Sequence, residues 1–214
     1  MEKEILQNLR QDYKSNTLSE IDSPENPFEM FEKWFSEALK SGIYEPNAMT
    51  LSTADKNGYP SARIVLLKGF DKERFTFYTN YNSQKGKEME ENPFACLLFF
   101  WPELERQIRI QGKIVKTSEN ESLAYFNSRP RASQIGALTS PQSQTIPNRD
   151  FLDLRWKELD QKYQNRPVPK PNYWGGYDLY PEFFEFWQGR SSRLHDRIAY
   201  KSEKGKWLRN RLAP

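Results

Sequence analysis

The sequence predicts a mainly β fold with peripheral helices (α+β), in which an antiparallel sheet closes into a barrel. Between residues 47 and 117 the apolar pattern has the two-residue period of strands, with short turns and no regular alternation of strand and helix. Residues 173–212 return to strands too short and too aromatic to stand alone, so we expect them to complete the barrel. With no internal repeat, residues 1–214 are expected to form one domain, whose residues 1–25 are a mobile arm.

The strands are predicted in chain order from their alternation and their turns. A hairpin over 48–70 turns at the Lys-Asn-Gly of residues 56–58, and a third strand follows at 74–80. Residues 94–101 form a continuous apolar run of the fully buried kind, whereas residues 105–117 alternate. The C-terminal strands are expected at 173–180, 183–189, 197–200 and 206–212.

The helices are predicted from caps and from apolar residues at helical spacing. Asn26 caps a helix that Pro27 opens and Gly42 ends. Ser118 and Glu121 form a capping box for a helix that stops at residue 130, and a short helix is expected at 83–93. The first helix should carry Ile5, Leu6, Leu9 and Tyr13 on one side, and the last, at 148–164, should turn Phe151, Leu154, Leu159 and Tyr163 inward. Residues 131–147 are expected to be a loop with one helical turn.

The composition excludes several classes of protein. Lys and Arg number 32 against 29 Asp and Glu, a net charge of +3 that is too weak to indicate nucleic acid but suits an anionic small ligand. A single cysteine and a single histidine exclude an internal disulfide and a Cys-rich or His-rich metal site. Glycine-rich nucleotide motifs, a membrane-length apolar run and a signal-peptide core are all missing, so we expect a cytoplasmic protein without metal.

Two stretches carry cations where a phosphate could bind. Arg63 and Lys68 stand at the two ends of an apolar strand, and a guanidinium matches phosphate oxygens with two parallel hydrogen bonds. Tyr78 and Thr79 end the next strand, and Lys85 begins the following helix, whose N-terminus favours an anion. Solvated strand ends and a simple helix cap would explain the same residues, so both interpretations stay open.

A further group combines hydroxyl, guanidinium and amide side chains. Tyr125 and Arg129 are four residues apart on one predicted helix, so they share a face, with Ser133 just beyond. This face suits a second phosphate, or it is an ordinary solvated helix face. The amides of Gln107 and Gln142 could hydrogen-bond the edge of a heteroaromatic ring.

The only histidine, His195, lies between Arg193 and Arg197 and shortly after Trp187. On a strand, the three side chains at 193, 195 and 197 would alternate onto one face and concentrate positive charge there. A lone histidine is more often structural than catalytic. The crowded charge nevertheless favours an anionic or electron-rich ligand at this point.

The chain resembles the pyridoxine/pyridoxamine 5'-phosphate oxidase family through motifs in the family's order: RIVLLK, FYTN, LERQ, SRPRASQIGA, WGGY, FWQG, RLHDR and RLAP. The resemblance runs from the region of Leu9 to Pro214. It implies an FMN-binding split β-barrel that is an obligate homodimer, with the flavin at the subunit interface. It also implies an oxidase that converts pyridoxine 5'-phosphate and pyridoxamine 5'-phosphate to pyridoxal 5'-phosphate, while O2 is reduced to hydrogen peroxide.

The resemblance further implies the residues of the site. Arg193 and His195 are implied to be catalytic, holding the pyridine ring. The implied flavin contacts are Arg63, Ile64, Val65, Leu66, Leu67, Lys68, Tyr78, Thr79, Gln84, Lys85, Gln107, Gln142, Ser143, Trp187 and Arg197. The implied substrate contacts are Arg10, Tyr13, Lys68, Tyr125, Arg129, Ser133, Arg193, Leu194 and His195. Gln84 stands where the family usually has arginine, and Arg190 falls in a variable spacer.

The alternative hypothesis is a non-catalytic split-barrel module that binds flavin or nucleic acid, since one fold hosts many functions. Aromatic side chains beside basic ones would suit stacking on bases. The net charge of +3 and the two separate phosphate-type clusters favour small phosphorylated ligands instead.

Overall fold

The computed structural model describes residues 3–9, 12–14 and 16–214 of the chain. It divides into two compact units. Unit 1 comprises Met1–Thr50, Leu97–Gln111 and Pro181–Pro214, and unit 2 comprises Leu51–Cys96 and Gly112–Tyr180. The single domain over residues 1–214, with an arm of residues 1–25, stays a prediction.

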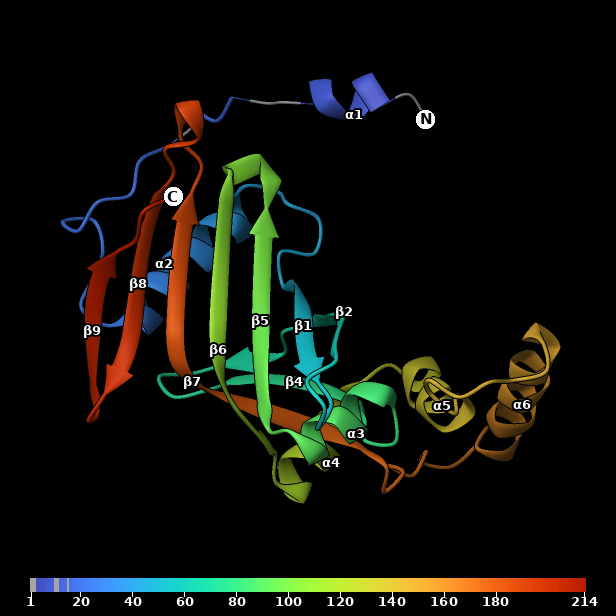
Figure 1. Ribbon diagram of the computed structural model, residues 1–214. Coiled ribbons are helices and arrows are strands. Elements are labelled where there is room, and N and C mark those ends of the chain that lie inside the picture. Colours follow the sequence, from blue (N-terminus) through green and yellow to red (C-terminus); the bar gives the residue numbers. More distant parts are fainter. Residues whose placement is uncertain (1–2, 10–11, 15) are drawn as a thin grey trace. The chain divides into compact units, whose positions relative to one another are not determined.

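The described elements are mainly strands, as predicted (Figure 1). The helices are α1 (Lys3–Asn8), α2 (Pro27–Lys40), α3 (Gln84–Glu91), α4 (Glu119–Ser128), α5 (Arg131–Thr139) and α6 (Arg149–Lys162), with 3-10 turns η1 (Pro102–Leu104) and η2 (Ser191–Arg193). The strands are β1 (Ala48–Ala54), β2 (Pro60–Leu66), β3 (Gly69–Phe70), β4 (Phe75–Asn80), β5 (Phe94–Trp101), β6 (Arg106–Lys116), β7 (Trp174–Gln188), β8 (Asp196–Glu203) and β9 (Lys206–Arg211). One sheet joins them in the order β2-β1-β5-β6-β7-β4-β3, with β8 paired to β7 and β9 to β8.

In unit 1, helix α2 packs an aromatic face on the strands. Asn26 caps the helix as predicted, by accepting a backbone hydrogen bond at 3.0 Å. The rings of Phe31 and Phe99 lie 5.3 Å apart, and those of Trp34 and Phe186 also lie 5.3 Å apart, both edge to face. In the same unit the C-terminal half of β7 pairs antiparallel with β8, and β8 pairs antiparallel with β9.

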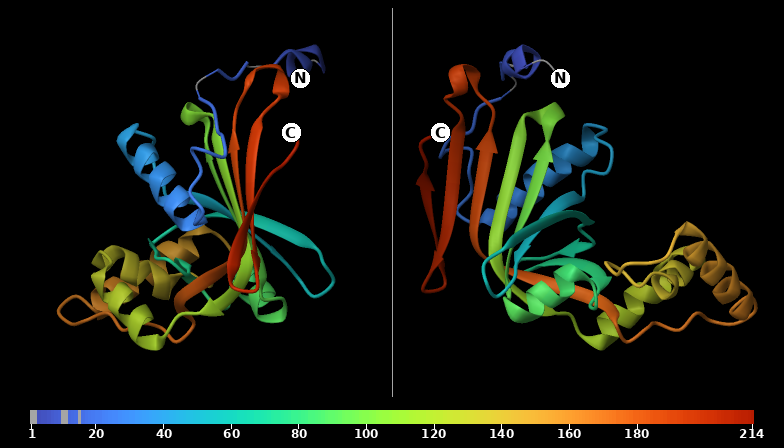
Figure 2. Two further views of the ribbon diagram at one scale, coloured as in Figure 1. Left: turned by 90° about the vertical axis from the view of Figure 1, so that its left-hand side faces the viewer. Right: turned by 45° about the vertical axis from the view of Figure 1, so that its right-hand side comes forward.

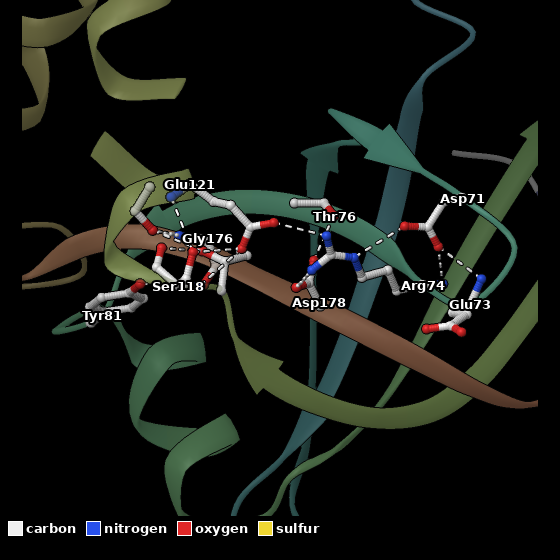
Figure 3. A network of polar contacts seen from close by, with 11 residues as sticks. Asp71, Glu73, Arg74, Thr76, Tyr81, Ser118, Glu121, Gly176 and Asp178 are labelled. Carbon is white, nitrogen blue, oxygen red and sulfur yellow. Dashed lines mark hydrogen bonds and ion pairs between the residues drawn. The ribbon is translucent and has the colours of Figure 1, made fainter. Parts of the chain in front are cut away.

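In unit 2, one arginine ties a turn, a strand and a helix together (Figure 3). Arg74 forms ion pairs with Asp71 at 3.2 Å, Asp178 at 2.6 Å and Glu121 at 2.8 Å. Asp178 belongs to β7, which pairs antiparallel with β4, and it also accepts a hydrogen bond from Thr76 at 2.6 Å. Glu121 completes the predicted capping box of α4. The network therefore fixes the start of α4 to β4 and β7.

The segment after α4 differs from the prediction. Residues 131–139 form a full helix, α5, which packs against α6 (Figure 2). The expected loop was wrong because Ile135 is fully buried in a cluster with Phe126 and Trp174, and this packing outweighs a weak local propensity. Trp156 of α6 packs against the same cluster.

Two strands also differ from the prediction. β7 runs unbroken through Pro181, which lies between the residues that pair with β4 (174–179) and those that pair with β8 (183–188). β5 is not buried throughout, since Phe94 and Phe100 are 55% and 52% exposed. Its apolar run therefore alternates, and the described residues cover the face that carries Phe94 and Phe100 only in part.

Some predicted helix faces are also corrected. Leu154 of α6 is 61% exposed, whereas Leu159 and Tyr163 pack inward as predicted. Helix α1 ends at Asn8, so Tyr13 lies beyond it, and both Ile5 and Leu9 are exposed. Within the described ranges, no helix combines the length and the hydrophobicity of a membrane span.

Candidate functional site

A cavity of about 610 Å³ in unit 2 collects most of the cations that the sequence singled out. We call it the cationic pocket. It is lined by Arg63, Ile64, Val65, Leu66, Lys68, Tyr78, Thr79, Asn80, Lys85, Tyr125, Arg129, Pro130, Ser133, Gln142 and Trp174. Strands β2 and β4, the start of α3 and the segment joining α4 to α5 therefore supply predicted flavin and substrate contacts to one cavity.

Arg63 is held at the wall of the cationic pocket by a buried carboxylate, Glu88 of α3. Its Nη2 donates to Glu88 at 3.1 Å, and its two terminal nitrogens also bond Ser61 and Thr53. Glu88 accepts further hydrogen bonds from Thr53 at 2.5 Å, Ser61 at 2.6 Å and Gln84 at 2.8 Å. Burial raises the pKa of Glu88, but these hydrogen bonds outweigh burial and lower it to about 2. The carboxylate therefore stays charged and orients Arg63.

Lys85 is a buried cation near the N-terminus of α3. Its Nζ donates to Gln142 at 2.8 Å and to the hydroxyls of Thr79 and Ser83 at 3.3 Å each. Burial and then the nearby Arg63 lower the pKa of Lys85 to about 8, although Glu88 acts in the opposite direction. Because its hydrogen-bond acceptors are neutral, the ammonium group suits an anion at the helix N-terminus.

Arg129 is a second, partly buried cation of the cationic pocket. It is the extended residue that ends α4, so the prediction that it shares a helix face with Tyr125 was wrong in detail, although both line the cavity. Its guanidinium lies 4.7 Å from the Trp174 ring, and Tyr125 stacks on Tyr78 at 3.9 Å. Burial lowers the pKa of Arg129, and its Nη1 is buried with no hydrogen-bond partner in the described part of the chain. A buried N–H donor without an acceptor indicates a site for an anion.

A second cavity, of about 670 Å³, lies in unit 1 and contains the only histidine. We call it the histidine pocket. It is lined by Leu9, Asp12, Tyr13, Trp187, Arg190, Ser192, Arg193 and His195. The His195 ring lies 4.6 Å from the Trp187 ring and 5.7 Å from the Tyr13 ring. Gly189 makes room for this packing, because a Cβ there would come within 2.8 Å of the Tyr13 ring.

The predicted strand carrying Arg193, His195 and Arg197 on one face does not form. Ser191–Arg193 is a 3-10 turn, and β8 begins only after His195. The last two residues of the turn have φ of 56° and 61°, a left-handed conformation that costs about 1 kcal/mol per residue and clusters at functional sites. Arg197, on β8, pairs with Glu185 at 2.8 Å. The turn, and not strand alternation, brings Arg193 and His195 to one cavity.

Other predicted residues do not line either cavity. Leu67 is buried in unit 2, and Ser143 is exposed there with φ of 67°. In unit 1, Gln107 is half-buried on β6, and Leu194 is exposed. Arg10 lies outside the described residues.

Sequence reasoning missed several lining residues, namely Asn80, Pro130 and Trp174 in unit 2 and Leu9, Asp12, Arg190 and Ser192 in unit 1. Each of these lies within or next to a motif that stood out, so extending the motifs by two residues would have found them. Glu88 had no such signal, because its partner Arg63 is 25 residues away.

The sheet and the cationic pocket together define a split-barrel protein that binds anionic small ligands. Residues 35–163 match the family described as "Pyridoxamine 5'-phosphate oxidase". Residues 174–214 match the "Pyridoxine 5'-phosphate oxidase C-terminal dimerisation region". The chain belongs to the pyridoxamine 5'-phosphate oxidase family, which confirms the prediction made from its motifs.

Relatives match over nearly the full length. The chain is 53% identical to the pyridoxine/pyridoxamine 5'-phosphate oxidase of Acaryochloris marina, over 98% of this chain and 95% of that protein. It is 55% identical to the protein of the same name from Leptospira interrogans, over 96% and 97%. Among solved structures, PhzG from Burkholderia lata in complex with tetrahydrophenazine-1-carboxylic acid is 30% identical, with a TM-score of 0.88 over 93% of this chain and 98% of that chain. This likeness confirms the predicted split-barrel fold.

Proposed function

We propose that this protein is an FMN-dependent oxidase that converts pyridoxine 5'-phosphate and pyridoxamine 5'-phosphate to pyridoxal 5'-phosphate, with O2 reduced to hydrogen peroxide. The family of the chain supports this proposal, and so do two relatives named pyridoxine/pyridoxamine 5'-phosphate oxidase, which are 53% and 55% identical to it. The observation that carries the proposal is the cationic pocket, where Lys85 and the unpartnered Nη1 of Arg129 are buried at a cavity.

FMN is the cofactor, and the cationic pocket suits its phosphate. Lys85, with only neutral acceptors around it among the described residues, is assigned to that phosphate together with Arg63 and Thr79. Gln84 donates to Glu88, so in this proposal it acts on the flavin site through that carboxylate and Arg63. The remaining proposed flavin contacts are residues 64–68, Tyr78, Gln107, Gln142, Ser143, Trp187 and Arg197.

The substrate phosphate is assigned to Arg129, Tyr125, Ser133 and Lys68. A guanidinium offers two parallel donors to phosphate oxygens, and the two hydroxyls add further hydrogen bonds. Stacking on Trp174 holds the Arg129 guanidinium without using its donors, which leaves them for the ligand.

Bound FMN would supply the redox chemistry, namely acceptance of a hydride from C4' of the substrate and reduction of O2 to hydrogen peroxide. Arg193 and His195 hold the pyridine ring at near-attack distance, because orientation is the main contribution a protein can make to such a transfer. Trp187, whose ring lies 4.6 Å from His195, keeps the imidazole in place. Tyr13 and Arg10 are assigned to cover the substrate.

In this proposal the protein is an obligate homodimer with FMN at the interface. The match of residues 174–214 to a dimerisation region supports a dimer. Dissociating it in mild denaturant should release FMN, because the proposed contacts come from two copies of the chain. Flavin fluorescence and light scattering measure this together. A clean monomer that keeps all its flavin would contradict an interfacial site.

The colour of the purified protein tests the function. We expect a yellow protein that bleaches anaerobically with pyridoxine 5'-phosphate and regains its colour in air with formation of hydrogen peroxide. The alternative, a non-catalytic flavin- or nucleic-acid-binding module, predicts a yellow protein that the substrate does not bleach, or a colourless one retained on single-stranded DNA.

A further inference from the structure

The only histidine accepts a hydrogen bond from a backbone amide of its own turn. The N–H of Arg190 donates to His195 Nδ1 at 3.1 Å. A ring nitrogen that accepts a hydrogen bond carries no hydrogen, so the neutral imidazole holds its hydrogen on Nε2. The described residues contain no hydrogen-bond partner for Nε2. The free donor of His195 is therefore Nε2–H.

The Arg190 side chain bridges the two ends of the same turn. Its Nη1 pairs with Asp196 Oδ2 at 3.0 Å, so residues 190 and 196 are joined across the turn that contains His195. Asp196 is itself well anchored, because Oδ1 pairs with Arg211 at 2.9 Å and Oδ2 accepts from the Leu18 N–H at 3.1 Å. Arg190 is thus tied to a fixed point of unit 1, and its amide is held in line with the imidazole.

The backbone of the turn makes this restraint necessary. Ser192 and Arg193 are both in the left-handed region without being glycine, and the Leu194 N–H donates to Ser191 at 3.1 Å to close the turn. Such a conformation persists only when its surroundings over-determine it. Two of those restraints are the ion pair between Arg190 and Asp196 and the hydrogen bond from the Arg190 N–H to the imidazole.

We propose that Arg190, which falls in a spacer with no assigned role, is a positioning residue for His195. It fixes the tautomer in which Nε2 donates a hydrogen bond to an acceptor atom of the substrate, and it prevents Nδ1 from acting as a base. This rests on the proposed function only for the identity of the substrate, because the tautomer is a property of the protein itself.

Nitrogen NMR reads the tautomer directly, since the chain has one histidine and its two ring nitrogens are the only imidazole signals. In the FMN-loaded protein labelled with ¹⁵N-histidine, above the range where imidazole titrates, we expect Nε2 in the protonated range and Nδ1 in the unprotonated range. A hydrogen on Nδ1 would overturn the proposal. This measurement needs no variant and no turnover, so it stands even if the oxidase activity is absent.

Variants then test the role of the side chain. Arg190→Ala should mix the two tautomers and raise KM for pyridoxine 5'-phosphate about fivefold, the size of one neutral hydrogen bond, with kcat and FMN affinity little changed. Arg190→Lys should restore most of the wild-type spectrum and KM, because an ammonium can still pair with Asp196. Arg149→Ala removes an exposed arginine from α6 and should change neither quantity. An Arg190→Ala protein with the wild-type tautomer and KM, or one that loses FMN and kcat instead, would refute the positioning role.

Discussion

The cationic pocket of unit 2 and the histidine pocket of unit 1 hold their cations in opposite ways. In the cationic pocket Lys85 is 9% exposed with neutral acceptors, and Arg129 has a buried donor without a partner. In the histidine pocket Arg190 is paired with Asp196, and Arg193 is exposed. Burying a cation without a counter-ion costs free energy that a bound anion returns. The first pocket is thus suited to an anion, and in our proposal the second orients a ring.

The two pockets also differ in the structural elements that position their side chains. Side chains of the cationic pocket come from β2, β4 and the ends of helices, which are fixed by sheet pairing and by networks such as that of Arg74. The histidine pocket depends on a strained turn, Ser191–Arg193, and on Tyr13 from beyond α1. Substitutions of the cations in the first pocket should therefore change binding constants, and substitution of Arg193 in the second should change the rate of the chemical step.

The largest effect is expected from Arg193→Lys. The lysine ammonium is a point charge and cannot replace the planar guanidinium with its parallel donors. A small misplacement of the substrate ring lowers the rate about 100-fold, so kcat/KM should fall by that factor or more. FMN content should stay unchanged. Rapid-reaction measurement of anaerobic flavin reduction gives the answer, and a near-wild-type reduction rate would remove Arg193 from the orienting role.

Arg129→Leu should raise KM for the phosphorylated substrate about 50-fold and leave kcat and bound flavin nearly unchanged. The expected loss of binding free energy equals that of one or two charge-assisted hydrogen bonds. A contact to the substrate phosphate stabilises the ground state and the transition state alike, so its removal mainly raises KM. Arg149→Leu, on the exposed face of α6, is the matched control. An unchanged KM in Arg129→Leu would show that this cation does not take the substrate phosphate.

The affinity of the apoprotein for FMN should fall as the pH rises above about 8, the pKa to which burial lowers Lys85. Lys85 is positive below that pH and neutral above it, so attraction to the phosphate weakens by up to about tenfold per pH unit. The free energy of unfolding should instead rise between pH 8 and 10.5, the ordinary pKa of a lysine. The reason is that in this range the unfolded chain still binds the Lys85 proton, whereas the folded chain has released it.

Fluorescence titration of FMN between pH 7 and 9.5 measures the affinity, and Lys85→Met should give a flat profile. A wild-type profile that is equally flat would remove Lys85 from the FMN phosphate.

A smaller effect is expected from His195→Asn, about tenfold in kcat/KM, because the variant loses the one hydrogen bond that Nε2–H donates. A role in proton transfer would instead cost about 10²–10⁴-fold. The rate of flavin reduction separates the two, and a loss in the higher range would show that the histidine pocket moves a proton as well as orienting the ring.

Local patterns predicted the parts of the molecule that depend on neighbours in the chain. The Asn26 cap, the Ser118 and Glu121 capping box and the alternation of β6 all appear as expected, because a cap or a strand face needs only a few adjacent residues. The motifs likewise predicted the family, and they named most residues that line the two pockets.

The sequence by itself therefore determined the class of fold, the family and the residue types of the site. Only the tertiary structure decided which side chains meet. Glu88 finds Arg63 across 25 residues, and Arg74 finds Asp178 across 104, distances over which no periodic pattern operates. The turn at Ser191–Arg193 replaced a predicted strand because its left-handed backbone is stable only with long-range restraints, among them the anchoring of Asp196 by Arg211 and Leu18. Burial and charge pairing across the fold, and not local propensity, gave the two pockets their different chemistry.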